Sequence, residues 1–289
     1  MVQPRTWADA LAAKAEATDL LPIAGGTDVM VDLNFDRHRP PGLLDLTRVE
    51  EIRQWVVRDG VVELGAGVSY AQVIADLRQL LPGLAMASRT VGSPQIRNRG
   101  TVGGNVGSAS PAGDALPPLL AARAVVEVES VRGRRRIPVD QFFTGVKRCA
   151  LAPDELIRTL HVPVATGPEQ FSKIGSRNAM VIAVASFGLS LDAAGHRVGT
   201  GIGSAAPTPR RALDAETFLD EALRGAGSWD ARQPLEESVV HQFGELVAAA
   251  ADPIDDVRGS AAYRRRALAV MARRTLTWAW ADYRRESSA

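Results

Sequence analysis

The stretch that most constrains this chain is residues 101–120, TVGGNVGSASPAGDALPPLL. Gly103 and Gly104 can adopt positive φ at no steric cost, so a tight turn here can point successive backbone N–H groups at one anionic ligand. Thr101 and Asn105 add short polar groups that bind phosphate or ribose oxygens without adding charge. The pattern is typical of a loop that holds a diphosphate, and a Gly/Ser-rich surface loop before a short helix is the plainer alternative.

Asp114 is the only carboxylate in this stretch. Because a carboxylate beside a diphosphate would be repelled, we expect Asp114 to cap a helix that begins at Ala115, to accept hydrogen bonds from sugar hydroxyls, or to do both. Pro117 and Pro118 suit the first turn of that helix, where backbone N–H groups have no partner within the helix. The stretch thus predicts a polar loop followed directly by a helix.

Residues 21–30, LPIAGGTDVM, form a second candidate loop. A short apolar run leads directly into GGTD at 25–28, so a strand is predicted to end in a tight polar turn with free N–H groups. Two such turns, far apart in the sequence, can close on one elongated anionic cofactor.

The pair of loops resembles a known family. AGGTD at 24–28 followed by TVGGNVGSASPAGD at 101–114 is similar to the FAD-binding (medium) subunit of the molybdenum hydroxylases, the group of xanthine dehydrogenase and carbon monoxide dehydrogenase. Further segments resemble the family in the expected order: L-x-P-x-E-[IL] at 151–156, F-x-K-x-x-x-R at 171–177 and GSxxYRR at 259–265. The resemblance therefore covers nearly the whole chain.

The fold that the resemblance implies is α+β in two domains. A two-part FAD-binding domain of the vanillyl alcohol oxidase (PCMH) type is expected over residues 1–167, with subdomains of about 1–57 and 58–167. A smaller α+β C-terminal domain is expected over residues 168–289. We place the boundary at ATGP, 165–168, because small and helix-breaking residues there separate two patterned regions.

The resemblance also implies which residues hold FAD. It places Ile157 in apolar contact with the flavin or adenine ring, and it brings Lys173 near the flavin, where a cation would stabilise the reduced, anionic ring. The candidate cofactor-binding residues are Ile23, Ala24, Gly25, Gly26, Thr27, Asp28, Val29, Thr101, Gly103, Gly104, Asn105, Asp114, Ile157 and Lys173. One position departs from the family, because Val181 precedes Ile182 and Ala183 where many members have an acidic residue.

The function implied by the resemblance is that of an electron-transfer subunit of an oxidoreductase, with no catalytic acid or base of its own, because the cofactor carries the chemistry. In the family a large partner subunit holds molybdopterin and oxidises the substrate. A small partner subunit carries two [2Fe–2S] clusters, from which electrons reach FAD in the chain described here. Assembly as a dimer of such three-chain units is the family expectation.

The external electron acceptor and the substrate stay open at this stage. A nicotinamide nucleotide such as NAD, dioxygen and a quinone are the alternatives for the acceptor. Purines such as xanthine are the first expectation for the substrate, and carbon monoxide, nicotine and other aromatic heterocycles remain open, because the selecting pocket would lie in another chain.

Two other functions compete with electron transfer. One is a self-contained FAD-dependent oxidase of the vanillyl alcohol oxidase type, but aromatic residues make up only 5% of the chain and no His, Tyr and Asp converge on a site for proton abstraction. The other is a binding or assembly protein without turnover, against which the intact glycine turns and Lys173 argue.

Composition excludes several other classes of protein. Cys149 is the only cysteine, which rules out an internal disulfide and an iron–sulfur cluster held by four thiolates of this chain. The four histidines, His38, His161, His196 and His241, are scattered, so we expect surface or loop histidines and no zinc site. No apolar run approaches the 18 residues of a membrane span, and residues 1–17 lack a secretory pattern, which predicts a cytoplasmic protein.

Charge gives no reason to expect nucleic acid, because 34 basic and 33 acidic residues leave a formal charge of +1. The arginine-rich run VRGRRR at 131–136 is interpreted as a charged hairpin tip, because it lies between two predicted strands and has no interleaved aromatic residues.

Periodicity also predicts the main helices and hairpins. Ser69 is expected to cap a helix that Pro82 and Gly83 end, and Asp59-Gly60 is expected to turn a hairpin. The other predicted elements are strands at 20–24 and 42–46, a hairpin at 192–195, and helices at 7–17, from about 212, at 237–251 and at 261–283, the last with its arginines facing outward.

Overall fold

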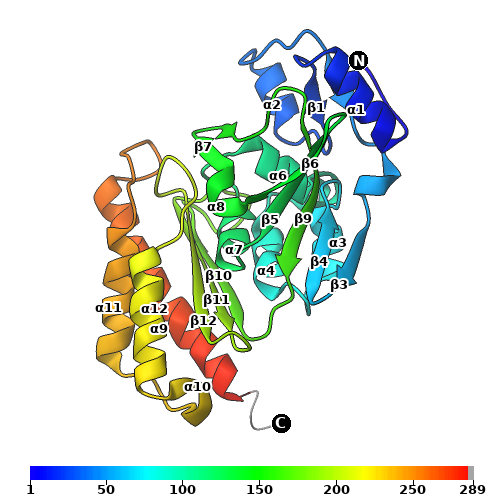
Figure 1. The fold of residues 1–289 in the computed structure, drawn as a ribbon. Coiled ribbons are helices and arrows are strands. Elements are labelled where there is room, and N and C mark those ends of the chain that lie inside the picture. The colour runs from blue at the N-terminus through cyan, green and yellow to red at the C-terminus, as the bar shows by residue number, and fades with distance from the viewer. Residues whose placement is uncertain (286–289) are drawn as a thin grey trace.

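The computed structural model describes residues 1–285, so residues 286–289 at the end of the predicted C-terminal domain lie outside the described part. Four layers follow one another across the molecule: a five-stranded sheet, a group of short helices, a three-stranded sheet and a layer of long helices (Figure 1). A small N-terminal unit packs against one end of the five-stranded sheet (Figure 1).

The N-terminal unit pairs two strands in parallel and covers them with a helix. Its elements are α1 Trp7–Glu16, β1 Leu21–Ile23, α2 Val29–Asn34, β2 Leu43–Asp45 and the 3-10 helix η1 Glu50–Ile52. Thr6 caps α1 by accepting from the Asp9 N–H at 3.1 Å. The buried side chains of Trp7, Leu44 and Ile52 belong to its small core. The predicted helix and both predicted strands are confirmed here, and α2 was not predicted.

The five-stranded sheet is antiparallel, in the order β3-β4-β9-β5-β6. Its strands are β3 Trp55–Arg58, β4 Val61–Gly65, β5 Val125–Ser130, β6 Gly133–Pro138 and β9 Leu156–Pro163. The predicted hairpin between β3 and β4 is confirmed, since Asp59 and Gly60 both have positive φ, 50° and 72°. The inner face of the sheet and the short helices share one apolar core.

The short helices between the sheets are α3 Tyr70–Asp76, α4 Pro82–Thr90, α5 Pro94–Arg99, α6 Val102–Ser108, α7 Leu116–Ala121 and α8 Val139–Phe142, with a small hairpin of β7 Phe143–Gly145 and β8 Arg148–Cys149 beside them. Ser69 caps α3 as predicted, in a capping box with Gln72. Pro82 begins α4 as well as following α3, because proline is favoured in the first turn of a helix. The predicted single helix of 69–81 is therefore wrong in its end, which lies at Asp76.

The C-terminal part is a three-stranded antiparallel sheet covered by long helices. The strands are β10 Glu169–Ile174, β11 Ala185–Asp192 and β12 Arg197–Gly203, and the helices are α9 Leu213–Gly225, α10 Ser228–Ala231, α11 Glu237–Ala249 and α12 Ala261–Arg285. Helices α4 and α7 pack on the opposite face of this sheet. A Cβ at Gly201 would lie 2.0 Å from the Pro117 carbonyl oxygen, so β12 needs glycine for this close approach. The predicted hairpin and the predicted helices are confirmed.

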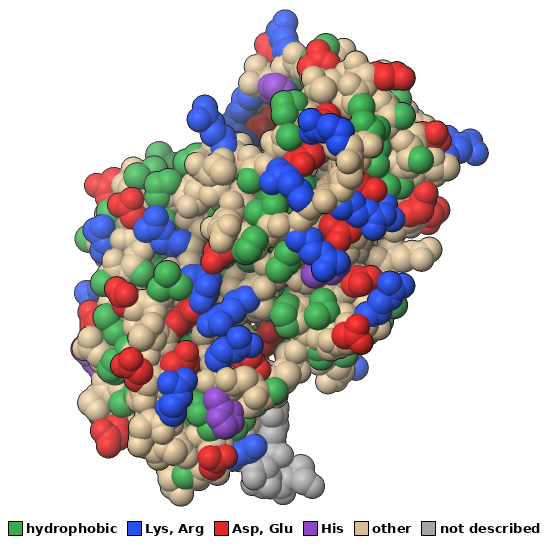
Figure 2. Space-filling view, viewed as in Figure 1, with side chains coloured by type: hydrophobic (Ala, Val, Ile, Leu, Met, Phe, Trp, Pro, Cys, Tyr) green, Lys and Arg blue, Asp and Glu red, His purple; other side chains and the backbone are tan. Residues whose placement is uncertain are grey.

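The arginine-rich run forms the predicted hairpin tip, with Val131 and Arg132 in the turn between β5 and β6, and it continues into strand β6. Arg134 and Arg136 belong to strand β6, where they face the glutamates of β5: Arg136 Nε lies 3.0 Å from Glu127 Oε2, and Arg134 Nε lies 3.1 Å from Glu129 Oε1. The glutamates come from the alternating VEVE segment of the neighbouring strand, so the run completes cross-strand pairs. Positive and negative side chains also intermingle over the face shown in Figure 2.

Two predictions about charged residues are wrong. His161 lies in strand β9 and contacts Glu127 at 3.1 Å instead of occupying the surface or a loop. Arg264, in the first turns of α12, is 4% exposed, whereas the arginines of this helix were predicted to face outward. Arg264 donates to the Val184 and Ser204 carbonyls at 2.9 and 2.6 Å and pairs with Asp256 at 2.5 Å. It thus ties α12 to the start of β11.

Within residues 1–285, no helix combines the length and the apolar character that crossing a membrane requires. The same residues contain no group of three or more His, Cys, Asp or Glu side chains that could hold a metal ion.

Candidate functional site

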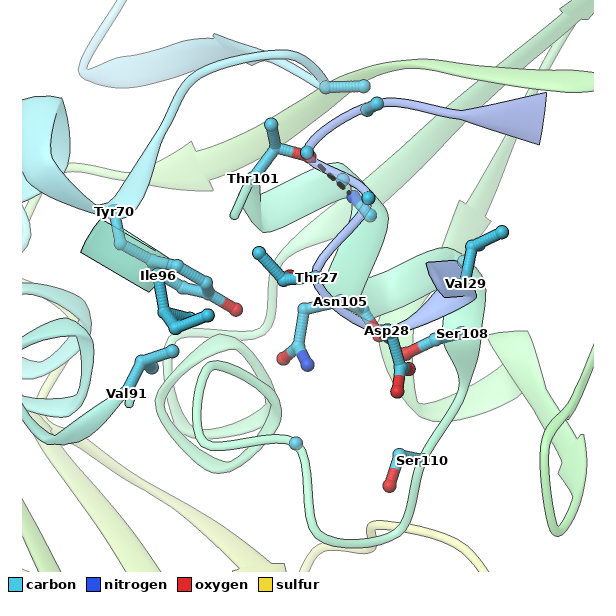
Figure 3. A pocket seen from close by; sticks show the side chains of 18 of the residues that line it. Thr27, Asp28, Val29, Tyr70, Val91, Ile96, Thr101, Asn105, Ser108 and Ser110 are labelled. Carbon is cyan, nitrogen blue, oxygen red and sulfur yellow. Dashed lines mark hydrogen bonds between the residues drawn. The ribbon is translucent and has the colours of Figure 1, made fainter. Parts of the chain in front are cut away.

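A cavity of about 540 Å³ lies between the N-terminal unit and the short helices (Figure 3). Residues from 21–29 and 101–114 line it, so the two predicted loops do meet. Residues from 151–157 and the segment 180–182 complete its walls. The remaining lining residues are Leu46, Ile52, Ala66, Tyr70, Val91, Gly92 and Ile96.

The first loop connects β1 to α2. Gly26 has φ of 74°, in the left-handed region that favours glycine. A Cβ at Gly25 would lie 2.0 Å from the Arg99 carbonyl oxygen, so the loop presses directly against the end of α5. The N–H groups of residues 25–29 donate to no atom of the described chain and lie beside the cavity, whereas the N–H groups of Met30 and Val31 donate to the carbonyls of Gly26 and Asp28.

The second loop differs from its prediction. Gly103 and Gly104 do not form a turn with positive φ but lie in the first turn of α6, and Thr101 is the N-cap residue. Thr101 Oγ1 accepts from the Gly104 N–H at 2.9 Å (Figure 3), a cap of the kind worth about 1 kcal/mol. A Cβ at Gly103 would lie 2.5 Å from Ala66 Cβ. Glycine is therefore needed here for close packing of α6, and the first N–H groups of α6 donate to the carbonyls of Val68 and Ala66 and to Thr101.

Twelve of the candidate residues line the cavity: Ala24, Gly25, Gly26, Thr27, Asp28, Val29, Thr101, Gly103, Gly104, Asn105, Asp114 and Ile157. Two candidates do not. Ile23 is the last residue of β1 and lies behind Gly26, and Lys173 in β10 is separated from the cavity by Asp114.

Asp114 and Lys173 form a buried ion pair at the edge of the cavity, with Lys173 Nζ 2.5 Å from Asp114 Oδ2. Thr90 Oγ1 donates to the same carboxylate oxygen at 3.1 Å. Burial raises the pKa of Asp114, and Lys173 and Thr90 oppose that rise. Asp114 caps no helix, because α7 begins at Leu116 without a side-chain cap, so this part of the prediction is wrong.

Three buried polar atoms at the cavity have no hydrogen-bond partner within the described chain: Tyr70 Oη, Asn105 Oδ1 and Asp114 Oδ1. Buried polar atoms are nearly always hydrogen-bonded, so three unpartnered atoms in one cavity indicate a polar ligand. Apolar walls at Ile96 and Ile157 would suit a planar ring system. The residues present therefore fit a dinucleotide such as FAD, which combines polar phosphates and sugars with two flat rings.

Several lining residues were not found from the sequence. Tyr70 follows the predicted N-cap Ser69, but nothing in the sequence places its side chain in the cavity. Val91 directly follows α4 and Ile96 lies in the first turn of α5, and neither residue was predicted to line the cavity. The segment 180–182 does carry a signal, since it includes Val181, the position that departs from the family pattern.

The fold and the residues that line the cavity fit the class of nucleotide-binding proteins. Residues 1–165 match the family described as FAD binding domain in molybdopterin dehydrogenase, and residues 170–279 match the CO dehydrogenase flavoprotein C-terminal domain. The chain therefore belongs to the FAD-binding, or medium, subunits of the molybdenum hydroxylases, which are oxidoreductase subunits. Both the resemblance and the predicted two-domain α+β fold are confirmed.

Relatives cover nearly the whole chain. The xanthine dehydrogenase FAD-binding subunit of Escherichia coli O157:H7 is 28% identical over 94% of this chain and 92% of its own length. The nicotine 6-hydroxylase medium subunit of Paenarthrobacter nicotinovorans is 31% identical over 90% of this chain and 89% of its own length. Carbon monoxide dehydrogenase from Hydrogenophaga pseudoflava has a similar structure, with a TM-score of 0.88 at 27% identity, covering 97% of this chain and 96% of that chain.

Proposed function

We propose that this chain holds FAD in the cavity between the loops at 24–28 and 101–105 and serves as the electron-transfer subunit of a molybdenum hydroxylase. The observation that carries the proposal is the convergence of the unpartnered atoms of Tyr70, Asn105 and Asp114 on that cavity. When bound, FAD supplies the redox chemistry, taking electrons from iron–sulfur clusters of a partner chain and passing them to an external acceptor.

The chain's own residues have three tasks in this proposal. The N–H groups of residues 25–29 bind the phosphates, since no acceptor of the described chain takes them and successive backbone N–H groups in a turn favour anions. Ile157 packs against a ring of the cofactor. Lys173 acts on the cavity through Asp114: it holds one carboxylate oxygen, and the other oxygen stays free for a donor on the ligand.

We also propose the domain bounds 1–167 and 168–289, with subdomains of about 1–57 and 58–167. The family matches over 1–165 and 170–279 support the first boundary. The change from the five-stranded sheet, which ends at Pro163, to the three-stranded sheet, which begins at Glu169, supports it independently.

The partners in this proposal are a large subunit with molybdopterin and a small subunit with [2Fe–2S] clusters, assembled as a dimer of heterotrimers. Relatives named medium subunit and medium chain support a complex of several chains. Relatives named for xanthine, nicotine and carbon monoxide differ in substrate, so similarity alone does not select one. We take xanthine or another purine as the first substrate to test, and NAD as the first acceptor.

The test is to follow the flavin absorption of the chain anaerobically, purified alone and together with its partner subunits. Xanthine should reduce the flavin only when the partners are present, because the substrate pocket lies in another chain. Reduction by NADH would support a nicotinamide acceptor, and flavin that stays oxidised with NADH would favour dioxygen or a quinone. Reduction by substrate of the chain alone would contradict the electron route and support a self-contained oxidase.

A further inference from the structure

Tyr70 is fixed at the edge of the cavity by its backbone. It is the first residue of α3, directly after the capping box of Ser69. Its N–H donates to the Gly100 carbonyl oxygen at 3.1 Å, and Ser69 forms an isolated antiparallel bridge with Thr101. The start of α3 is thus tied to the residues that begin α6. Tyr70 therefore needs no large rearrangement to present its ring to a ligand in the cavity.

The Tyr70 side chain lies where the two loops meet. A Cβ placed on Gly100 would lie 3.3 Å from Tyr70 Cδ2 and 3.4 Å from Thr27 Oγ1, so the phenol ring and Thr27 are close neighbours. The ring is 3% exposed, and its hydroxyl points toward Thr27 and Asn105 (Figure 3). This hydroxyl has no hydrogen-bond partner among residues 1–285. Its position places it beside Thr27, in the loop at 25–29 whose N–H groups are assigned to the phosphates.

The charges around the cavity make a neutral donor necessary. No lysine, arginine or histidine from the described part of the chain lines it, whereas Asp28 and Asp114 do. Two negative phosphates must therefore be met by N–H and O–H groups without formal charge. Burial, followed by the two aspartates, raises the pKa of Tyr70 well above its usual value, so the phenol keeps its proton. A protonated phenol that has no other partner is a hydrogen-bond donor.

We propose that Tyr70 is an FAD-binding residue whose hydroxyl donates a hydrogen bond to an oxygen of the cofactor's diphosphate. This inference rests on the proposed function and assigns a donor that lies outside both glycine loops. It explains why a buried hydroxyl is tolerated without a partner in the chain itself: the partner is the phosphate.

The test is Tyr70→Phe in the full chain, from which FAD is removed and to which it is added back. The dissociation constant of FAD, measured by quenching of flavin fluorescence, should rise at least tenfold, because hydrogen bonds to charged groups are among the stronger ones. The inhibition constant of ADP as a competitor should rise by a similar factor, because ADP carries the diphosphate without the flavin. An unchanged dissociation constant of FAD would overturn the assignment. A raised dissociation constant of FAD with an unchanged inhibition constant of ADP would overturn it too.

Stability of the FAD-free chain separates binding from folding. Because the Tyr70 hydroxyl is unpartnered, Tyr70→Phe should leave the melting temperature of the FAD-free chain unchanged or higher. The control is Tyr283→Phe, which removes a buried hydroxyl that donates to the Trp229 carbonyl at 2.9 Å. That variant should melt lower and bind FAD normally. A Tyr70→Phe chain that melts well below the wild type would show that the hydroxyl is structural, and a wild type without FAD affinity would instead refute the proposed function.

Discussion

Glu169 provides the sharpest test of the electrostatics that join the two domains. It is the first residue of β10, and its carboxylate reaches the start of α4, where Oε2 accepts from the Gly83 N–H at 2.9 Å. The side chain is buried, and this burial raises the pKa of Glu169 to about 7. The hydrogen bonds from Gly83 and Ser190 lower the pKa but do not outweigh burial. The carboxylate is therefore costly to ionise at this position.

The sign and size of the effect follow from linkage. The folded-state pKa of Glu169 is above the unfolded value of about 4.5, so the folded chain binds the proton more tightly. The contribution of Glu169 to the free energy of unfolding is most favourable below pH 4.5. It declines as the pH rises toward 7 and is fully lost above that pH. The unfolded pKa of 4.5 and the folded pKa of about 7, at about 1.36 kcal/mol per pH unit, give a loss of about 3 kcal/mol in the free energy of unfolding.

The variant to make is Glu169→Gln, since glutamine keeps the acceptor oxygen for Gly83 and cannot ionise. The free energy of unfolding of the FAD-free variant and wild type is measured in urea from pH 4.5 to pH 8. The variant should match the wild type at pH 4.5 and be more stable by up to about 3 kcal/mol at pH 8. A difference that is the same at every pH, or a loss of stability at pH 8, would refute the reasoning.

Glu155→Gln is the control of opposite sign, because the Glu155 side chain is also little exposed, at 8%, but its pKa is lowered, chiefly by the hydrogen bonds from Arg135. Its contribution is present above the unfolded pKa and is lost as the pH falls through the folded pKa. Glu155→Gln should therefore destabilise the chain at pH 8, and the difference should shrink in acid, opposite to Glu169→Gln.

Three further predictions concern the site and its support. Gly25→Ala should abolish FAD retention in a folded chain or prevent folding, because its Cβ would lie 2.0 Å from the Arg99 carbonyl oxygen. The control is Gly225→Ala, where a Cβ meets nothing within 4 Å. In a flavin-content assay this control should retain FAD as the wild type does. Lys173→Met removes the cation that opposes the raised pKa of Asp114, so the carboxyl stays protonated until the pH rises and then ionises without a partner. The FAD dissociation constant of this variant should therefore rise with pH, and a constant that does not respond to pH would exclude that role. Arg264→Met should lower the free energy of unfolding in urea by about 2 kcal/mol, since it removes the donor to the Val184 and Ser204 carbonyls, and a loss below about 1 kcal/mol would contradict this.

The two loops were predictable from the sequence because each is a local pattern of small and polar residues after an apolar run. The reason for glycine was not predictable at Gly103, where Ala66 of another segment forbids a side chain. Thr101 similarly has a role that depends on the helix it caps, and the sequence suggested a turn in its place. Local patterns therefore located the loops, and tertiary packing decided their conformation.

Long-range pairing accounts for the rest of what the sequence did not reveal. Arg136 and Glu127 meet through strand register, which a run of arginines does not specify. Arg264 was predicted to face outward with the other arginines of its helix, but it donates to the carbonyls of Val184 and Ser204, which lie beside the ends of β11 and β12. Tyr70 lies in the cavity because α3 is bonded to Gly100, a contact between segments that the sequence alone does not join.

The most direct test of the central claim is the flavin content of the purified full-length chain. The protein is saturated with FAD, freed of unbound cofactor and denatured, and the released flavin is identified by chromatography and counted per chain. The account predicts one FAD per chain for the wild type and little or none for Gly25→Ala. A folded wild-type chain that retains no flavin would contradict the claim that this cavity binds FAD.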